Sequence, residues 1–203
     1  MYTTVLALLA LPLTHLTSAS PVQIPGKASV TRDTDSDTDS DTGCTHTSFN
    51  GFQWDVQAFD YHASFIFTTP AHQNSWGYVN FNLSNPADKS LAKCSASSNQ
   101  LSDFFYGNMV YNCETAEGKQ TGSFDFNKAS GELRVNQTWR CDDQDPQWPI
   151  RIKASGSAII PLDCTERLYQ NANWTLGQIY STRDITCKPV TLPIVPTEIS
   201  AVA

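Results

Sequence analysis

The sequence predicts an all-β protein, a compact antiparallel β-barrel or sandwich of short strands with three disulfides. Beyond Gly43, aromatic and β-branched residues alternate with polar ones, which is the pattern of strands with one buried face. Turn-forming pairs such as Asn85-Pro86 and Ser130-Gly131 interrupt this alternation at short intervals. The six cysteines also lie beyond Gly43, and their even number allows complete pairing.

Residues 1–19 have the layout of a signal peptide. An apolar run at 5–13 is followed by polar Thr14 and His15 and then by small residues, and Pro21 favours cleavage after Ala19. The run is too short to cross a bilayer, which needs about 20 apolar residues, and no later stretch is longer. We therefore expect a secreted, extracellular protein without a membrane segment.

Residues 20–43 are expected to form a disordered linker. Asp alternates with Ser or Thr in its residues 31–42, where no apolar side chain offsets the entropy of ordering. Asp37, Asp39 and Asp41 imitate the start of a calcium loop, but Thr42 and Ser48 stand where its glycine and its bidentate glutamate belong. We predict no metal and no cofactor.

The linker contributes −3 to the net charge of −7, because its five aspartates outnumber Lys27 and Arg32. From Cys44 onward, 11 basic residues face 15 acidic ones, which is no electrostatic footprint for nucleic acid. Residues 44–188 are predicted as the β-barrel domain. Residues 189–203 contain Pro189, Pro193 and Pro196, and we expect a flexible tail.

Strand chemistry recurs along the domain, and only two short segments have a helical pattern. The helical segments are 100–106 and 165–170. The expected strands are 52–59, 62–68, 78–83, 91–96, 109–113, 122–126, 132–139, 151–160 and 179–187.

In an oxidising compartment the cysteines are expected to form disulfides, although spacing alone leaves 15 pairings open. The six are Cys44, Cys94, Cys113, Cys141, Cys164 and Cys187. Three sequons begin at Asn82, Asn136 and Asn173, and we expect N-glycosylation there.

The sequence predicts no enzyme. No Gly-x-Ser-x-Gly elbow is present, and the nearest motif, residues 155–157, falls inside a predicted strand. His62 and His72 lack the framework of a zinc site. A glycosidase would need two spatially paired carboxylates. Asp103, Asp125 and Glu132 are the candidates, and we expect each to be a solvated strand-face or turn residue.

Tryptophans point instead to recognition. Trp54 and Trp139 fall in alternating strands and are expected in the core, whereas Trp76, Trp148 and Trp174 lie beside turns, where exposed rings favour binding. Trp148 shares its loop with three aspartates, and we take this loop as the candidate contact surface. Those aspartates are Asp142, Asp143 and Asp145.

The order and spacing of cysteines and aromatics resemble the Alternaria major allergen family of fungal secreted β-barrel proteins. The resemblance rests on 52–61, Cys94 with Cys113, 123–126, 135–139, and Cys164 with Cys187. It implies an allergen or an elicitor or suppressor of plant defence, without established catalysis. It also implies two local bridges, Cys94 with Cys113 and Cys164 with Cys187, which leave Cys44 and Cys141 for each other.

In the founding allergen, a cysteine near the mature amino terminus joins two subunits, and a phenolic-ligand site lies at their junction. Cys44 occupies the corresponding place here, but Cys141 offers it a partner within the chain. We therefore expect a monomer. The leading hypothesis is a fungal effector-like protein that binds a plant host protein or a cell-wall component. The alternative is a secreted carbohydrate-binding module that uses its loop tryptophans.

Overall fold

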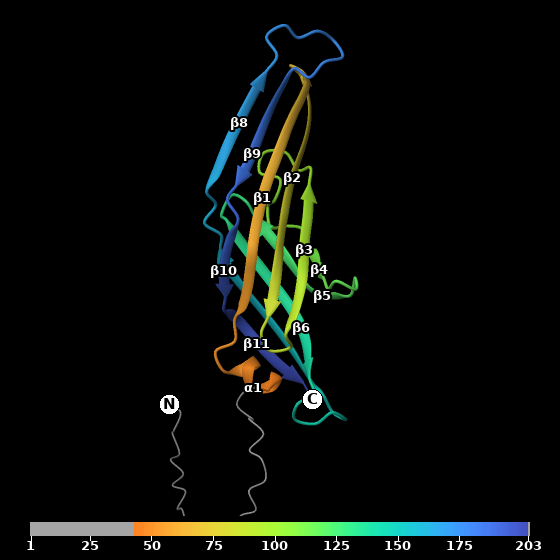
Figure 1. The fold of residues 1–203 in the computed structure, drawn as a ribbon, viewed down its shortest axis with the longest axis vertical. Coiled ribbons are helices and arrows are strands. Elements are labelled where there is room, and N and C mark those ends of the chain that lie inside the picture. The colour runs from red at the N-terminus through yellow and green to blue at the C-terminus, as the bar shows by residue number, and fades with distance from the viewer. Residues whose placement is uncertain (1–42, 203) are drawn as a thin grey trace, which may run out of the picture. The chain divides into compact units, whose positions relative to one another are not determined.

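The computed structural model describes residues 43–202, so the expected signal peptide and all of the expected linker except Gly43 lie outside the described residues. Within this range, one short helix accompanies eleven strands of one antiparallel sheet (Figure 1). The elements are α1 (Cys44–Phe49), β1 (Trp54–Thr69), β2 (His72–Asn85), β3 (Ser90–Ser98), β4 (Tyr111–Glu114), β5 (Gln120–Asn127), β6 (Glu132–Cys141), β7 (Ile150–Ile159), β8 (Cys164–Gln170), β9 (Ser181–Cys187), β10 (Val190–Ile194) and β11 (Pro196–Val202). The all-β prediction is confirmed, although the sheet is not closed into a complete barrel.

The first strand is twice as long as expected, because a β-bulge joins two predicted strands into one. Trp54 and Val56 face the core before the bulge, which lies between Gln57 and Asp60, and Phe59 and Tyr61 face it beyond the extra residue. The extra residue is Ala58, with φ of +53°. The shift from even to odd positions breaks the period-two pattern while keeping one face buried, so one strand has two short alternations in the sequence.

The prediction of a flexible tail at 189–203 is wrong for most of this segment. β10 pairs with β1, and β11 pairs with β7. In the strand order of the sheet, β1 and β7 are separated by β2 to β6, so the segment connects two strands that are far apart in that order. Val190, Leu192 and Ile194 alternate toward the core, and Ile194 is fully buried. Pro189 precedes β10, Pro193 lies in β10, which pairs only with β1 among the described strands, and Pro196 is the first residue of β11; Pro is tolerated on edge strands and at strand starts.

Gly156 lets this segment pass close to β7. A Cβ built on Gly156 would lie 2.8 Å from the carbonyl oxygen of Val195 and 3.1 Å from Cα of Pro196. Both neighbours are backbone atoms, so a side chain could be admitted only by moving the strand. The Ser-Gly-Ser sequence at 155–157 is therefore a close crossing point of two backbones.

Both predicted helical segments are wrong. Residues 165–170 belong to β8, whose pairing with β9 overrides a weak local preference. Residues 100–106 form turns that carry Phe104 and Phe105 into the core, where both are almost completely buried. Across the described range, no helix has the length and apolarity needed to span a bilayer.

The core is aromatic and includes the two tryptophans expected there. Trp54 is 0% and Trp139 4% exposed, and Phe52 stacks on Trp139 with ring centroids 4.9 Å apart. Buried Gln137 accepts hydrogen bonds from the Trp54 indole (2.7 Å) and from Asn85 (3.0 Å). A polar side chain thus fixes the orientation of two core groups.

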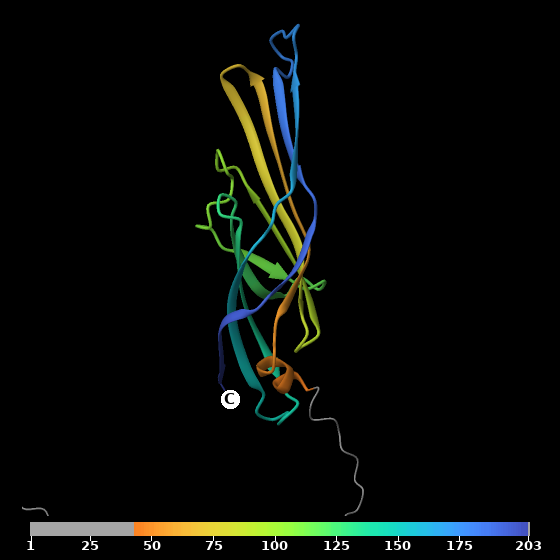
Figure 2. The same cartoon turned by 90° about the vertical axis from the view of Figure 1, so that its left-hand side faces the viewer.

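Four strands extend beyond the rest of the sheet, as Figures 1 and 2 show. We call this extension the arm; it consists of β8, β9, residues 62–69 of β1 and residues 72–76 of β2. The remaining strands form the body. The arm loop, 171–180, joins β8 to β9 and is tied to β1 by the hydrogen bond from the Tyr180 N–H to the Phe67 carbonyl (2.8 Å).

All six cysteines are paired. Cys94 bonds to Cys113 across β3 and β4, and Cys164 to Cys187 across β8 and β9. The third disulfide, Cys44 with Cys141, fixes α1 to the end of β6. These are the pairs that the family resemblance implies.

Candidate functional site

The Trp148 loop, residues 142–149, joins β6 to β7 beside α1, and one of its aspartates is structural. Asp143 accepts hydrogen bonds from the Thr45 N–H (3.1 Å) and the Thr45 hydroxyl (2.6 Å). Partial burial opposes the charge, but the hydrogen bonds from Thr45 outweigh it and lower the pKa of Asp143. Asp143 therefore anchors α1, and in the folded chain its carboxylate already accepts hydrogen bonds from Thr45.

Asp145 shapes the same loop. Its carboxylate accepts a hydrogen bond from the Gln147 N–H (2.9 Å), and its carbonyl accepts one from the Trp148 N–H (3.1 Å). This turn leaves the Trp148 side chain 72% exposed, and Asp142 is exposed too. Of the four predicted contact residues, Trp148 and Asp142 are thus available to a partner, while Asp143 and Asp145 organise the loop.

The other two tryptophans expected at the surface differ from Trp148. Trp174 packs into the arm loop, where its indole donates to the Gln178 carbonyl (2.9 Å) and its ring meets Tyr180 edge-on. Trp76 lies within β2 and is 41% exposed. Two residues further along the same face of β2, Tyr78 stacks on His62 with ring centroids 4.9 Å apart. His62 is thus in an aromatic pair on a strand.

The arm carries an exposed strand that sequence reasoning missed. All seven residues of β8 are exposed, including Leu168 at 72% and Tyr169 at 51%. Within the described sheet, β8 pairs only with β9, so its other edge presents free backbone donors and acceptors. Glu166 and Arg183 form a bidentate ion pair (2.5 and 3.1 Å) that lowers the pKa of Glu166 through the hydrogen bond from Arg183. The Thr-Glu-Arg-Leu-Tyr sequence had indicated a helix, which hid this edge.

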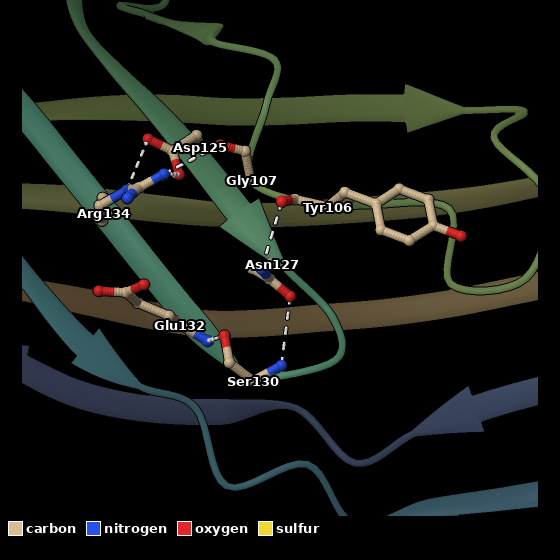
Figure 3. Close-up of polar contacts among 7 residues, drawn as sticks. All are labelled: Tyr106, Gly107, Asp125, Asn127, Ser130, Glu132 and Arg134. Carbon is tan, nitrogen blue, oxygen red and sulfur yellow. Dashed lines mark hydrogen bonds and ion pairs between the residues drawn. The ribbon is translucent and has the colours of Figure 1, made fainter.

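The carboxylates proposed for inspection as a glycosidase pair have different environments, shown for two of them in Figure 3. Asp125 is buried and pairs with Arg134, whose Nη2 lies 2.7 Å from Oδ1 and also donates to the Gly107 carbonyl (2.9 Å). The hydrogen bond to Asp125 raises the pKa of Arg134. The expectation that Asp125 is solvated is therefore wrong: the pair fastens the loop before β4 to the sheet.

The remaining contacts in Figure 3 hold the turn between β5 and β6. The Asn127 amide donates to the Tyr106 carbonyl (3.2 Å) and accepts from the Ser130 N–H (3.2 Å). The Ser130 hydroxyl accepts from the Glu132 N–H (3.3 Å). Asp103 is half-buried in the turn after β3. These residues shape the turn between β5 and β6 and the loop before β4, which contacts the end of β5 through the bridge between Tyr106 and Asn127.

The three sequon asparagines lie at different depths. Asn136 is exposed on β6, Asn173 is exposed in the arm loop, and Asn82 is half-buried on β2. Asn136 also lines a shallow groove of about 470 Å³ on the outer face of β5, β6 and β7. A glycan on Asn136 would therefore extend over this polar groove.

Within residues 43–202, no group of three or more His, Cys, Asp or Glu side chains is arranged to hold a metal ion.

A family model described as Alternaria alternata allergen 1 matches residues 56–187. Neither the curated proteins nor the solved structures gave a match. The matched region runs from β1 to Cys187 at the end of β9 and includes all strands from β2 to β8. The three disulfides and the family are compatible with a secreted protein. The chain therefore belongs to the Alternaria alternata allergen 1 family.

Proposed function

We propose that this chain is a secreted, non-catalytic effector-like protein that binds a plant host protein through the arm. One observation carries the proposal: β8 is ordered as a strand although it buries none of its residues. Its free edge offers a backbone template for an extended segment of a partner, and Leu168 and Tyr169 offer side-chain contacts on opposite faces. The partner is thus a protein segment that can add a strand.

The proposal includes a monomeric state. Cys44 is bonded to Cys141 within the chain, so its sulfur is not available to join a second subunit. A monomer keeps the β8 edge open for a different protein. Mass spectrometry of the unreduced protein, with light scattering in solution, tests this point, and a disulfide-linked dimer would contradict it.

The test of the arm compares two double variants of the purified, glycosylated protein in leaves. Leu168→Ser/Tyr169→Ser removes exposed apolar groups from β8, while the control, Val110→Ser/Ile159→Ser, removes similarly exposed groups from the body. The wild type and the control are expected to change the oxidative burst equally, and the β8 variant should lose most of the effect with unchanged circular dichroism. An unchanged response to the β8 variant, or no response to the wild type in several plant species, would contradict the proposal.

Sugar binding is the second candidate, and the exposure of Trp148 favours it. The Trp148 ring is 72% exposed on a turn whose backbone is held by Asp145. Such a ring can stack on a sugar face with little loss of conformational freedom. Trp148→Ala should abolish retention on a glycan array if this candidate is correct, and unchanged retention would remove the Trp148 loop as the sugar contact.

A further inference from the structure

Two arginines face each other across the sheet next to the Trp148 loop. Arg140 on β6 is the direct cross-strand partner of Arg151 on β7, and both are exposed. Like charges in this position repel and destabilise the strand pair. Lys153 follows two residues after Arg151, so it projects from the same face of β7. We call Arg140, Arg151 and Lys153 the basic patch.

The basic patch has no acidic partner within the described part of the chain. The ion pairs recorded there involve Arg134, Arg183, Lys188 and His62, and none involves the three residues of the patch. The full chain has a net charge of −7, so carboxylates are abundant elsewhere. Three neighbouring cations that form no ion pair provide a local attraction for an anion, which Glu198 beside Lys153 offsets only in part.

The patch borders two hollows that differ in lining, and Lys153 also lines a third, of about 230 Å³, together with Glu198. A pocket of about 340 Å³ is lined by Arg140, Arg151, Pro149 and Val202. The shallow groove near Asn136 begins at Lys153 and is lined mainly by neutral polar residues. Its other side chains include those of Gln120, Ser123, Asn136 and Thr138. Charge is therefore concentrated at one end of a surface that is otherwise rich in neutral hydrogen-bonding groups.

This combination matches a sugar chain that carries carboxylates. Guanidinium groups bind carboxylates through paired hydrogen bonds. Pro149 adds an apolar wall, and Trp148 precedes it directly in the chain. Nucleic acid is a poorer fit, because its affinity depends on neutralising many phosphates and the chain as a whole is acidic.

We infer that the basic patch and the pocket of Arg140, Pro149, Arg151 and Val202 bind an acidic polysaccharide of the polyuronide class; the groove that a glycan on Asn136 would cover is not part of this site. The inference rests on the sugar-binding candidate for the Trp148 loop and is independent of β8. In this inference, the charge of the arginines makes the site selective for acidic over neutral sugars, whereas Trp148 would stack on acidic and neutral sugars alike.

The test measures binding of the secreted protein to polygalacturonate and to fully methyl-esterified polygalacturonate, which has the same backbone without the charge. Arg140→Gln/Arg151→Gln is compared with Lys89→Gln/Lys93→Gln, which removes the same charge from residues outside both hollows. We expect the wild type and the lysine variant to bind the acidic polymer, with affinity falling as salt rises. The arginine variant should bind about tenfold more weakly or worse.

The outcomes separate this inference from the sugar-binding candidate. Equal binding of the acidic and esterified polymers would overturn the polyuronide inference but would still support sugar binding by the Trp148 loop. Equal loss in both double variants would show non-specific attraction and also overturn it. Absence of binding to either polymer overturns the inference, and the glycan array then decides the candidate separately. Unchanged circular dichroism of the arginine variant establishes that its loss is not due to unfolding.

Discussion

The body and the arm belong to one sheet but are stabilised in different ways. In the body, the inner face buries large aromatic side chains such as Trp54, Phe59 and Phe126. On the arm, β8 buries none of its residues, and the β8–β9 hairpin is held by Cys164–Cys187, the Glu166–Arg183 ion pair and backbone hydrogen bonds. Burial of apolar area dominates the body, whereas the β8–β9 hairpin depends more on its crosslink. Exposed apolar side chains such as Leu168 and Tyr169 are tolerated on β8 because this strand does not depend on burial.

The largest expected effect is in the body, at the crossing of β7 by the C-terminal segment. Gly156→Val should destabilise the fold by about 3 kcal/mol or more, because the new side chain collides with backbone at Val195 and Pro196. Urea unfolding measures this loss. Ser157→Val on the exposed face of the same strand is the control, with an expected change of about 0.5 kcal/mol or less. Equal effects of the two substitutions would contradict the close crossing.

A smaller and local effect is expected when the arm loses its crosslink. In the chain-entropy model, closing the 23-residue separation between Cys164 and Cys187 is worth about 3 kcal/mol. Cys164→Ser/Cys187→Ser should therefore accelerate hydrogen exchange in β8 and β9 while β6 and β7 stay protected. Cys44→Ser/Cys141→Ser is the matched control and should loosen α1 without exposing β8. Uniform acceleration through β6 would show that arm and body unfold as one unit.

The smallest expected effect is a loss of stability of the body at alkaline pH. Burial, with a smaller contribution from Asp103, raises the pKa of Tyr61 to about 12. The unfolded chain ionises near pH 10, so the stabilisation is complete below pH 10 and is lost as pH rises toward 12. The loss amounts to about 1 kcal/mol at pH 11. Tyr61→Phe should flatten the pH dependence of urea unfolding between pH 10 and 12. An unchanged slope would assign the alkaline loss to other groups.

Sequence alone was informative for the body, because its strands have one buried and one exposed face. Alternation at 78–83 and 132–139 identified β2 and β6, and Trp54 and Trp139 were assigned to the core. The pairing of cysteines needed the family resemblance, since spacing left it open. Where a bulge shifted the alternation in β1, the pattern gave two strands in place of one.

Sequence was less informative for elements whose role depends on distant partners. Prolines hid β10 and β11, and only pairing with β1 and β7 makes those segments strands. β8 has no buried face, so it leaves no periodic signal. The basic patch was also missed, because Arg140 and Arg151 are eleven positions apart and meet only through the register of β6 with β7. A search for hairpins with like charges at paired positions could have found it.

The position of the segment 190–202 also constrains the order of events during folding. β10 and β11 are the last strands in sequence, yet β10 pairs with β1, the first. A ribosome-bound chain that has not released these residues cannot bury Trp54 against Ile194 or fill the crossing at Gly156. The sheet therefore completes only after residues 190–202 have left the ribosome, and until then its first strand needs protection from aggregation.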